Sequence, residues 1–132
     1  MLGAMRRSVE DLRAFYGEPA GQLTAAQISK QGLSGECARC REVLALFCGM
    51  LGTAAANLAL ILGAVGGVYI GGGIVPRFGE FFANSDFRAR FEAHGRCRNY
   101  LAALPVFVIH SAYPALTGVQ TALNDYLEAQ HA

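Results

Sequence analysis

The longest uncharged stretch of the chain covers residues 43–76, and its character changes from one end to the other. Residues 37–62 repeat apolar side chains with a helical period, and charges occupy only the first turns. This pattern predicts a long helix that is apolar on nearly every side, which is typical of a helix buried in a core or embedded in lipid. The small residues Gly49 and Gly52 make one side thin, so another backbone can approach closely. The glycines that follow predict a turn into a short strand over residues 68–70.

Weaker patterns place further elements on both sides of this stretch. Apolar residues on one face predict a helix over residues 5–16, and Thr24 followed by Gln27 predicts a capping box that opens a short helix ending near Gly32. The remaining predicted elements are a helix starting at Pro76, a helix capped by Asn84 or Ser85, a helical turn at Tyr100 and Leu101, a strand over residues 106–109 and a last helix from Tyr113 and Pro114. This order indicates an α/β fold that is helix-rich with few strands. The apolar run of the second strand favours cover on both faces, and two strands alone do not make a stable sheet.

A membrane span is the main alternative for the apolar helix. Residues 44–62 give 19 uncharged positions, close to the length that crosses a bilayer. The small and polar residues Gly49, Thr53 and Asn57 weaken that interpretation, and no aromatic belt marks the far end. A covered sheet explains the following strand better, so the sequence favours a core helix and no membrane partner. Asn57 is then expected to be a buried amide with a backbone partner.

Composition and charge limit the class of protein. A length of 132 residues allows one hydrophobic core, and a net charge of +1 gives no electrostatic footprint for nucleic acid. The arginines between Arg88 and Arg98 are therefore expected to form a solvated helix face or a contact within the fold. The N-terminus lacks the order of a secretory signal, so the four cysteines are expected to be reduced in the cytoplasm. Cys37 and Cys40 have the spacing of a metal or redox pair, but no second pair accompanies them and no metal site is predicted.

Three glycines, Gly71, Gly72 and Gly73, directly follow the first predicted strand and precede a helix start. Because glycine has no Cβ, its backbone can lie against a base, ribose or phosphate and can adopt positive φ without penalty. A helix start adds N–H groups that have no helical partner. The pattern is neither the G-x-G-x-x-G fingerprint nor the P-loop. Taken alone, it fits a tight packing turn better than a nucleotide site.

A longer series of motifs changes this interpretation. The segments CxxCREVLALFC, GGVYIGGGIVPRF, FRxRFExxGRxxxYL and PVFVI occur in this order within residues 37–118. Together they resemble the C-terminal part of bacterial-type glucokinase, and GGVYIGGGIVPRF is the most specific segment. That family belongs to the hexokinase, actin and sugar-kinase ATPase superfamily. The resemblance implies an incomplete actin-like or hexokinase-like (ribonuclease H-like) α/β half.

The resemblance also implies a site and its partners. Family members transfer the γ-phosphate of ATP, with Mg²⁺, to the 6-hydroxyl of glucose, the first step of glycolysis, and commonly form homodimers. Gly71, Gly72 and Gly73 match the adenosine motif of the superfamily, with Gly72 and Gly73 expected against the adenine and ribose. Cys37 and Cys40 also match a family feature, which favours a structural role at a helix start over a metal site.

Other parts of the family's reaction centre have no counterpart in this sequence. They are a D-x-G-G-T phosphate loop, an Asn-Asp pair with the catalytic Asp, and the Glu and His sugar ligands. Asp11, Asp86 and Asp125 are expected to be solvated charges or caps, so no catalytic residue is predicted.

The chain is therefore expected to be a C-terminal fragment that is inactive alone. It would form one partial domain over residues 1–132, with a helical lead-in over residues 1–35 and an adenosine-motif core over residues 36–132. The alternative is a non-catalytic module that kept the fold for dimerisation or nucleotide binding.

Overall fold

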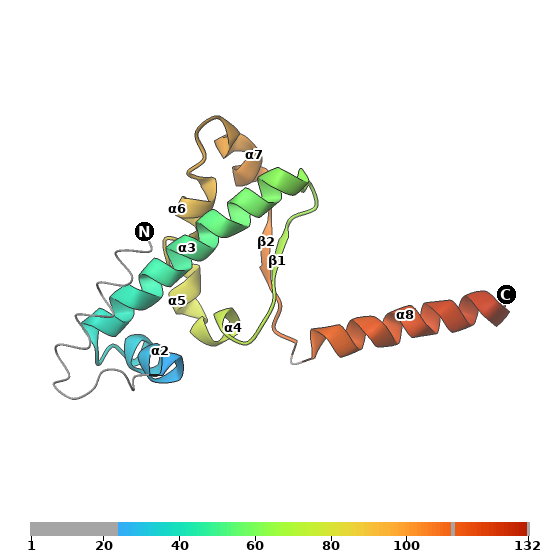
Figure 1. Ribbon diagram of the computed structural model, residues 1–132, viewed down its shortest axis with the longest axis horizontal. Helices are drawn as coiled ribbons and strands as arrows, with labels where there is room; N and C mark the ends of the chain where they lie inside the picture. Colours follow the sequence, from blue (N-terminus) through green and yellow to red (C-terminus); the bar gives the residue numbers. More distant parts are fainter. Residues whose placement is uncertain (1–23, 112, 132) are drawn as a thin grey trace.

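The computed structural model describes residues 24–111 and 113–131 (Figure 1). The helix predicted over residues 5–16 lies outside these residues. In chain order the described elements are α2 (Ala25–Ser34), α3 (Ala38–Leu62), β1 (Val68–Ile70), α4 (Val75–Phe78), α5 (Glu80–Ala83), α6 (Phe87–Glu92), the 3₁₀ turn η2 (Gly95–Cys97), α7 (Arg98–Ala103), β2 (Val106–Val108) and α8 (Pro114–His131). The predicted order of helices and two short strands is confirmed for this part of the chain.

The capping box at the start of α2 forms as the sequence predicts. The Gln27 N–H donates to the Thr24 hydroxyl at 3.3 Å, and the Thr24 N–H donates to the Gln27 side-chain oxygen at 2.8 Å. These two bonds satisfy backbone donors that a helix start leaves without a helical partner. The helix continues to Ser34, slightly beyond the expected end, and Gly35 closes it at a φ of 80°.

α3 is the longest described helix, and α2 and α6 pack against it (Figure 1). Cys37 precedes its first turn, and the Cys37 Sγ accepts a hydrogen bond from the Cys40 N–H at 3.1 Å. The helix ends where Gly63 adopts a left-handed φ of 59°. Cys37 therefore caps the start of α3, which is the position that the sequence predicts for it.

α3 is also long and apolar enough to cross a membrane, judged by length and composition among the described residues. One side of the helix is buried within the fold, where Leu44, Cys48 and Ala56 belong to the hydrophobic core. The other side leaves Ile61 81% and Leu62 69% exposed near the C-terminal end. α2 and α6 pack against this helix, so part of its apolar surface lies within the fold.

The two strands form a parallel pair with Val68 opposite Val106 and Ile70 opposite Val108. Ile70 is buried and joins the core. On the opposite face Tyr69 and Phe107 stack with ring centroids 5.0 Å apart and remain 65% and 44% exposed. The described residues cover only the face that carries Ile70, so the cover expected on the other face is not supplied by this part of the chain.

An aromatic core joins the short helices to α3. Phe78 of α4 and Phe87 and Phe91 of α6 are buried, and the Phe87 and Phe91 rings stack at 6.0 Å. The cap of α6 differs from the prediction, because Asp86 occupies the N-cap position. The Ser85 hydroxyl nevertheless accepts a hydrogen bond from the Phe87 N–H at 3.3 Å.

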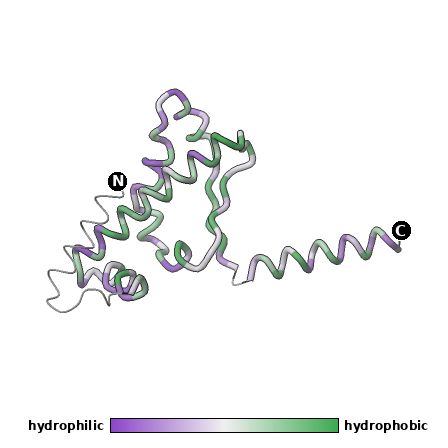
Figure 2. Tube along the Cα trace, in the orientation of Figure 1, coloured by the Kyte–Doolittle hydropathy of each residue, from purple (hydrophilic) through white to green (hydrophobic). Residues whose placement is uncertain are grey.

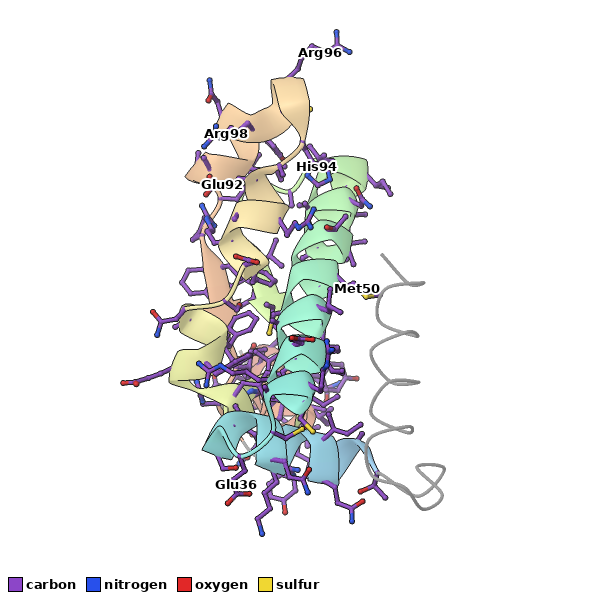
Figure 3. The ribbon with its side chains drawn as sticks, turned by 90° about the vertical axis from the view of Figure 1, so that its left-hand side faces the viewer. Glu36, Met50, Glu92, His94, Arg96 and Arg98 are labelled. Carbon is purple, nitrogen blue, oxygen red and sulfur yellow. The ribbon has the colours of Figure 1, made fainter. Side chains whose placement is uncertain are left out.

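The prediction for Asn57 is wrong. Asn57 is exposed, and its side-chain oxygen lies 2.9 Å from Nε2 of His94. Figure 3 shows His94 directed toward α3 from the segment that follows α6. The partner is therefore a side chain distant in the sequence, and the pair joins the C-terminal half of α3 to the end of α6.

Arg88 makes the contact within the fold that was one of the two expectations for the arginine cluster. Its guanidinium donates to the carbonyl oxygens of Leu104 at 2.9 Å and Ala102 at 2.7 Å, and its Nε donates to Glu92 at 2.6 Å. The carbonyls at the end of α7 lack helical partners, and the guanidinium supplies donors for them. Arg96 instead points away from the ribbon (Figure 3).

α8 projects away from the rest of the fold (Figure 1). Every described side chain from Tyr113 to Gln130 is exposed. Apolar and polar residues are interspersed along the helix (Figure 2), and the large apolar side chains exposed on it are Leu116, Val119, Leu123, Tyr126 and Leu127. The helix therefore has an apolar surface that the described residues do not cover.

Candidate functional site

The glycine turn lies at the carboxyl ends of the two parallel strands. Gly71 follows Ile70 directly, and the Ile109 N–H donates to the Ile70 carbonyl at 2.9 Å, so the segments leaving β1 and β2 begin side by side. A Cβ built on Gly71 would lie 3.7 Å from the Ile109 Cδ1, which is an ordinary contact. Ligands of open α/β sheets bind in the crevice outside the carboxyl ends of the strands. The position of the turn therefore fits a ligand site.

The three glycines differ in what they require. Gly72 has a φ of 108°, a conformation that side chains rarely adopt. A Cβ on Gly72 or on Gly73 would meet no other atom within 4 Å, so packing within the described residues does not demand a glycine at Gly73. The space beside Gly73 is open, and a ligand would approach the backbone there without a side chain in the way.

The turn can contact a ligand through its backbone, but it does not supply catalytic groups. α4 begins soon after the glycines, and Pro76 lies in its first turn as predicted. The helix has only 4 residues, so its dipole contributes little to an anion site. His110 follows β2 at the same edge and is exposed. The turn offers open backbone surface beside Gly72 and Gly73.

The carboxylates do not gather near the glycines. Asp86 occupies the N-cap position of α6 without a side-chain capping bond and Asp125 lies on α8, both exposed, while Asp11 lies outside the described residues. Within the described ranges no group of three or more His, Cys, Asp or Glu side chains is arranged to hold a metal ion. The donor set that Mg²⁺ prefers, several oxygens around one point, is therefore not assembled by this part of the chain.

A groove of about 600 Å³ lies elsewhere, between the start of α3 and the short helices α4 to α6. Its lining includes Arg41, Arg77, Phe81, Ser85 and Asp86. The Arg41 guanidinium lies 5.4 Å from the centre of the Phe81 ring. Sequence reasoning missed this groove, because its walls come from segments about forty positions apart and no local pattern marks them.

The cysteines have distinct environments. Burial, followed by the hydrogen bond and charge of the neighbouring Cys37 thiol, raises the pKa of Cys40 to about 12. Burial also raises the pKa of Cys48. Cys97 is exposed, and none of the four cysteines, which all lie within the described residues, is part of a disulfide.

The comparison of this sequence with known families identifies its family. The profile of the glucokinase family matches residues 5–126. This chain belongs to the glucokinase family. The resemblance drawn from the motifs around the glycine turn is confirmed.

Individual glucokinases show the extent of the match. The chain is 59% identical to the glucokinase of Chromobacterium violaceum over 116 residues, which cover 88% of this chain and 33% of the relative. It is 52% identical to the glucokinase of Aromatoleum aromaticum over 119 residues, covering 90% of this chain and 36% of the relative. The chain therefore spans about a third of the length of these relatives, and it corresponds to their C-terminal part.

A solved structure gives the same assignment for the fold. The chain resembles the crystal structure of a glucokinase from an Antarctic psychrotroph, with a TM-score of 0.75 and 37% sequence identity. The match covers 92% of this chain and 38% of that chain. The expectation of an incomplete, helix-rich α/β half of the hexokinase-like fold is thus confirmed.

Proposed function

We propose that this chain supplies the adenosine-contacting segment of a glucokinase that transfers the γ-phosphate of ATP to the 6-hydroxyl of glucose. The observation that carries the proposal is the open glycine turn at the carboxyl ends of two parallel strands, in a chain of this family. Gly71, Gly72 and Gly73 are assigned to ATP, with Gly72 and Gly73 against the adenine and ribose. The open space beside Gly73 supports this assignment, because a Cβ there would enter the volume that the nucleotide needs.

The phosphate end of the reaction is assigned to residues outside this chain. Phosphoryl transfer needs Mg²⁺ to spread the developing charge and a carboxylate to accept the sugar hydroxyl proton. Within the described residues no metal-binding cluster comes together, and only the adenosine end of ATP is proposed for this chain. No residue is therefore proposed as catalytic, and the isolated chain is expected to be inactive with ATP and glucose.

The remaining assignments complete the proposal. The chain is one partial domain over residues 1–132, with a lead-in over residues 1–35 and the adenosine-motif core over residues 36–132. It acts in the cytoplasm, without nucleic acid or membrane as partner, in a protein that forms homodimers. The exposed apolar side chains of α8 and of the sheet face support association, because large apolar patches rarely stay uncovered.

A chimera tests the proposal. This chain replaces the corresponding third of the Chromobacterium violaceum glucokinase, and formation of glucose 6-phosphate is measured with ATP and glucose. The chimera is expected to be active, and this chain alone is expected to give no glucose 6-phosphate. The variant Gly73→Val in the chimera is expected to raise the KM for ATP at least about tenfold, with little change in the KM for glucose.

The control variant is Gly66→Val, at the opposite end of β1. A Cβ on Gly66 also meets nothing within 4 Å, so both variants are expected to fold equally well. Equal ATP affinity in Gly73→Val, Gly66→Val and the parent chimera would refute the adenosine assignment. A folded chimera with no activity would instead favour the alternative of a non-catalytic module for dimerisation or nucleotide binding.

A further inference from the structure

Cys37 and Cys40 form a thiol pair at the first turn of the longest described helix. Cys37 is 8% exposed and Cys40 is fully buried. The Cys40 N–H donates to the Cys37 Sγ at 3.1 Å, so the first sulfur occupies the N-cap position. A helix N-terminus and a backbone N–H donor both stabilise negative charge on a sulfur at this position.

The spacing also suits a covalent bond between the sulfurs. The Cys37 Sγ lies 3.1 Å from the Cys40 backbone nitrogen, and the two thiols are hydrogen-bonded to each other, so a change of side-chain rotamer is enough to bring the sulfurs to bonding distance. The second sulfur contacts the preceding helix, because the Cys40 thiol donates to the Gln31 side-chain oxygen at 3.6 Å. Figure 3 shows Glu36, the neighbour of Cys37, pointing outward at this junction of α2 and α3.

We propose that Cys37 and Cys40 are a reversible dithiol–disulfide site that reacts with small-molecule disulfides such as oxidised glutathione. The Cys37 thiolate attacks one sulfur of the reagent, a mixed disulfide forms, and the other glutathione leaves as a thiolate. The Cys40 thiol then attacks the Cys37 Sγ, and its proton passes to the second glutathione, which leaves as a thiol. The protein loses two electrons and two protons, and the reagent is reduced to two thiols.

Oxidation changes the contact between α2 and α3. A disulfide sulfur carries no hydrogen, so Cys40 can no longer donate to Gln31 after the bond forms. The site thereby couples the thiol–disulfide balance of the surroundings to the junction of these helices.

The experiment uses the full chain carrying Cys97→Ser, which removes the exposed thiol. The chain is equilibrated with mixtures of reduced and oxidised glutathione, quenched with acid, alkylated and digested with trypsin. Cleavage after Arg39 separates residues 31–39 from residues 40–41, so the disulfide appears as a linked pair of peptides. Cys48 lies in residues 42–77 and serves as the internal control for a buried thiol without this geometry.

Two variants separate the steps. In Cys40→Ala the mixed disulfide on Cys37 is expected to accumulate, because no second thiol resolves it. In Cys37→Ser, which keeps a side chain suited to the N-cap, Cys40 is expected to remain unmodified. Circular dichroism establishes that each variant retains its helices.

The expected result for the Cys97→Ser chain is a linked peptide that appears as oxidised glutathione increases and disappears on return to reduced glutathione, while Cys48 stays alkylatable. Free thiols at Cys37 and Cys40 at every ratio in the folded chain would overturn the proposal. The proposal also fails if the pair forms its disulfide as readily in urea, since the folded geometry then contributes nothing.

Discussion

The backbone of Phe87 in α6 lies directly over Gly52 in α3. A Cβ built on Gly52 would lie 2.3 Å from the Phe87 carbonyl oxygen and 3.1 Å from its carbonyl carbon. No side-chain movement relieves such a clash, because the neighbouring atoms belong to the backbone. The close approach of α3 and α6, and with it the burial of Phe87 and Phe91, depends on this one glycine.

Gly52→Ala is therefore expected to destabilise the fold by about 2 kcal/mol, the usual range for overpacking. A loss of stability would be the opposite of the usual effect of this substitution, because alanine stabilises an unobstructed helix by about 1 kcal/mol relative to glycine. Gly118→Ala in α8 is the matched control, because a Cβ there meets nothing within 4 Å. Urea unfolding monitored by circular dichroism gives both values. A Gly52→Ala chain as stable as Gly118→Ala would show that the helices do not pack this closely.

Arg88 is expected to stabilise the fold because its forked guanidinium donates to two carbonyl groups at once. Arg88→Lys keeps the positive charge but cannot donate to Leu104 and Ala102 together, so the free energy of unfolding should fall by about 1 kcal/mol. This figure allows for an Arg88 side chain that is 42% exposed and partly screened by solvent. Arg90→Lys, at an exposed position of the same helix, should change stability by less than about 0.5 kcal/mol. Similar losses in both variants would contradict a specific role for Arg88.

Buried thiols make stability depend on alkaline pH. The pKa of Cys40 rises from its ordinary value of 9.0 to about 12 in the folded chain, so the folded state holds this proton where the unfolded state has released it. The contribution is complete below pH 9 and is lost as the pH rises from 9 toward about 12. Stability of the Cys97→Ser chain should fall with pH in this window, and Cys40→Ala in the same background should fall less steeply. The free energy of unfolding is measured with urea from about pH 8 to about pH 11 in both chains. An equal fall with pH in the two chains would refute the burial of Cys40.

Local patterns were sufficient for most of the elements. The capping box of Thr24 and Gln27, the start of α3 at Cys37 and the position of Pro76 involve neighbours three or four positions apart. Such interactions depend on the residues within one helical turn, so a short window of sequence contains their causes.

The failures of prediction concern contacts between distant positions. Asn57 pairs with His94, 37 positions away, and the groove beside Arg41 is completed by residues near position 80. At the start of α6 Asp86 occupies the N-cap position, and the Asn84 side chain donates instead to the Glu80 carbonyl at 3.0 Å. A pattern of apolar and polar positions does not state which segments meet, so it does not determine these partners.

The sequence by itself determined the helices, the two strands, the glycine turn and the membership of the glucokinase family. Propensity, capping and the period of apolar residues act locally. The order of the motifs reflects common ancestry and can be recognised without knowing how the chain packs. Only the tertiary structure decided which glycine the packing requires, which thiols are buried and which faces stay exposed. Those properties depend on how close two distant segments come, as with Gly52 beneath Phe87 and with Tyr69 stacked on Phe107 at an uncovered sheet face.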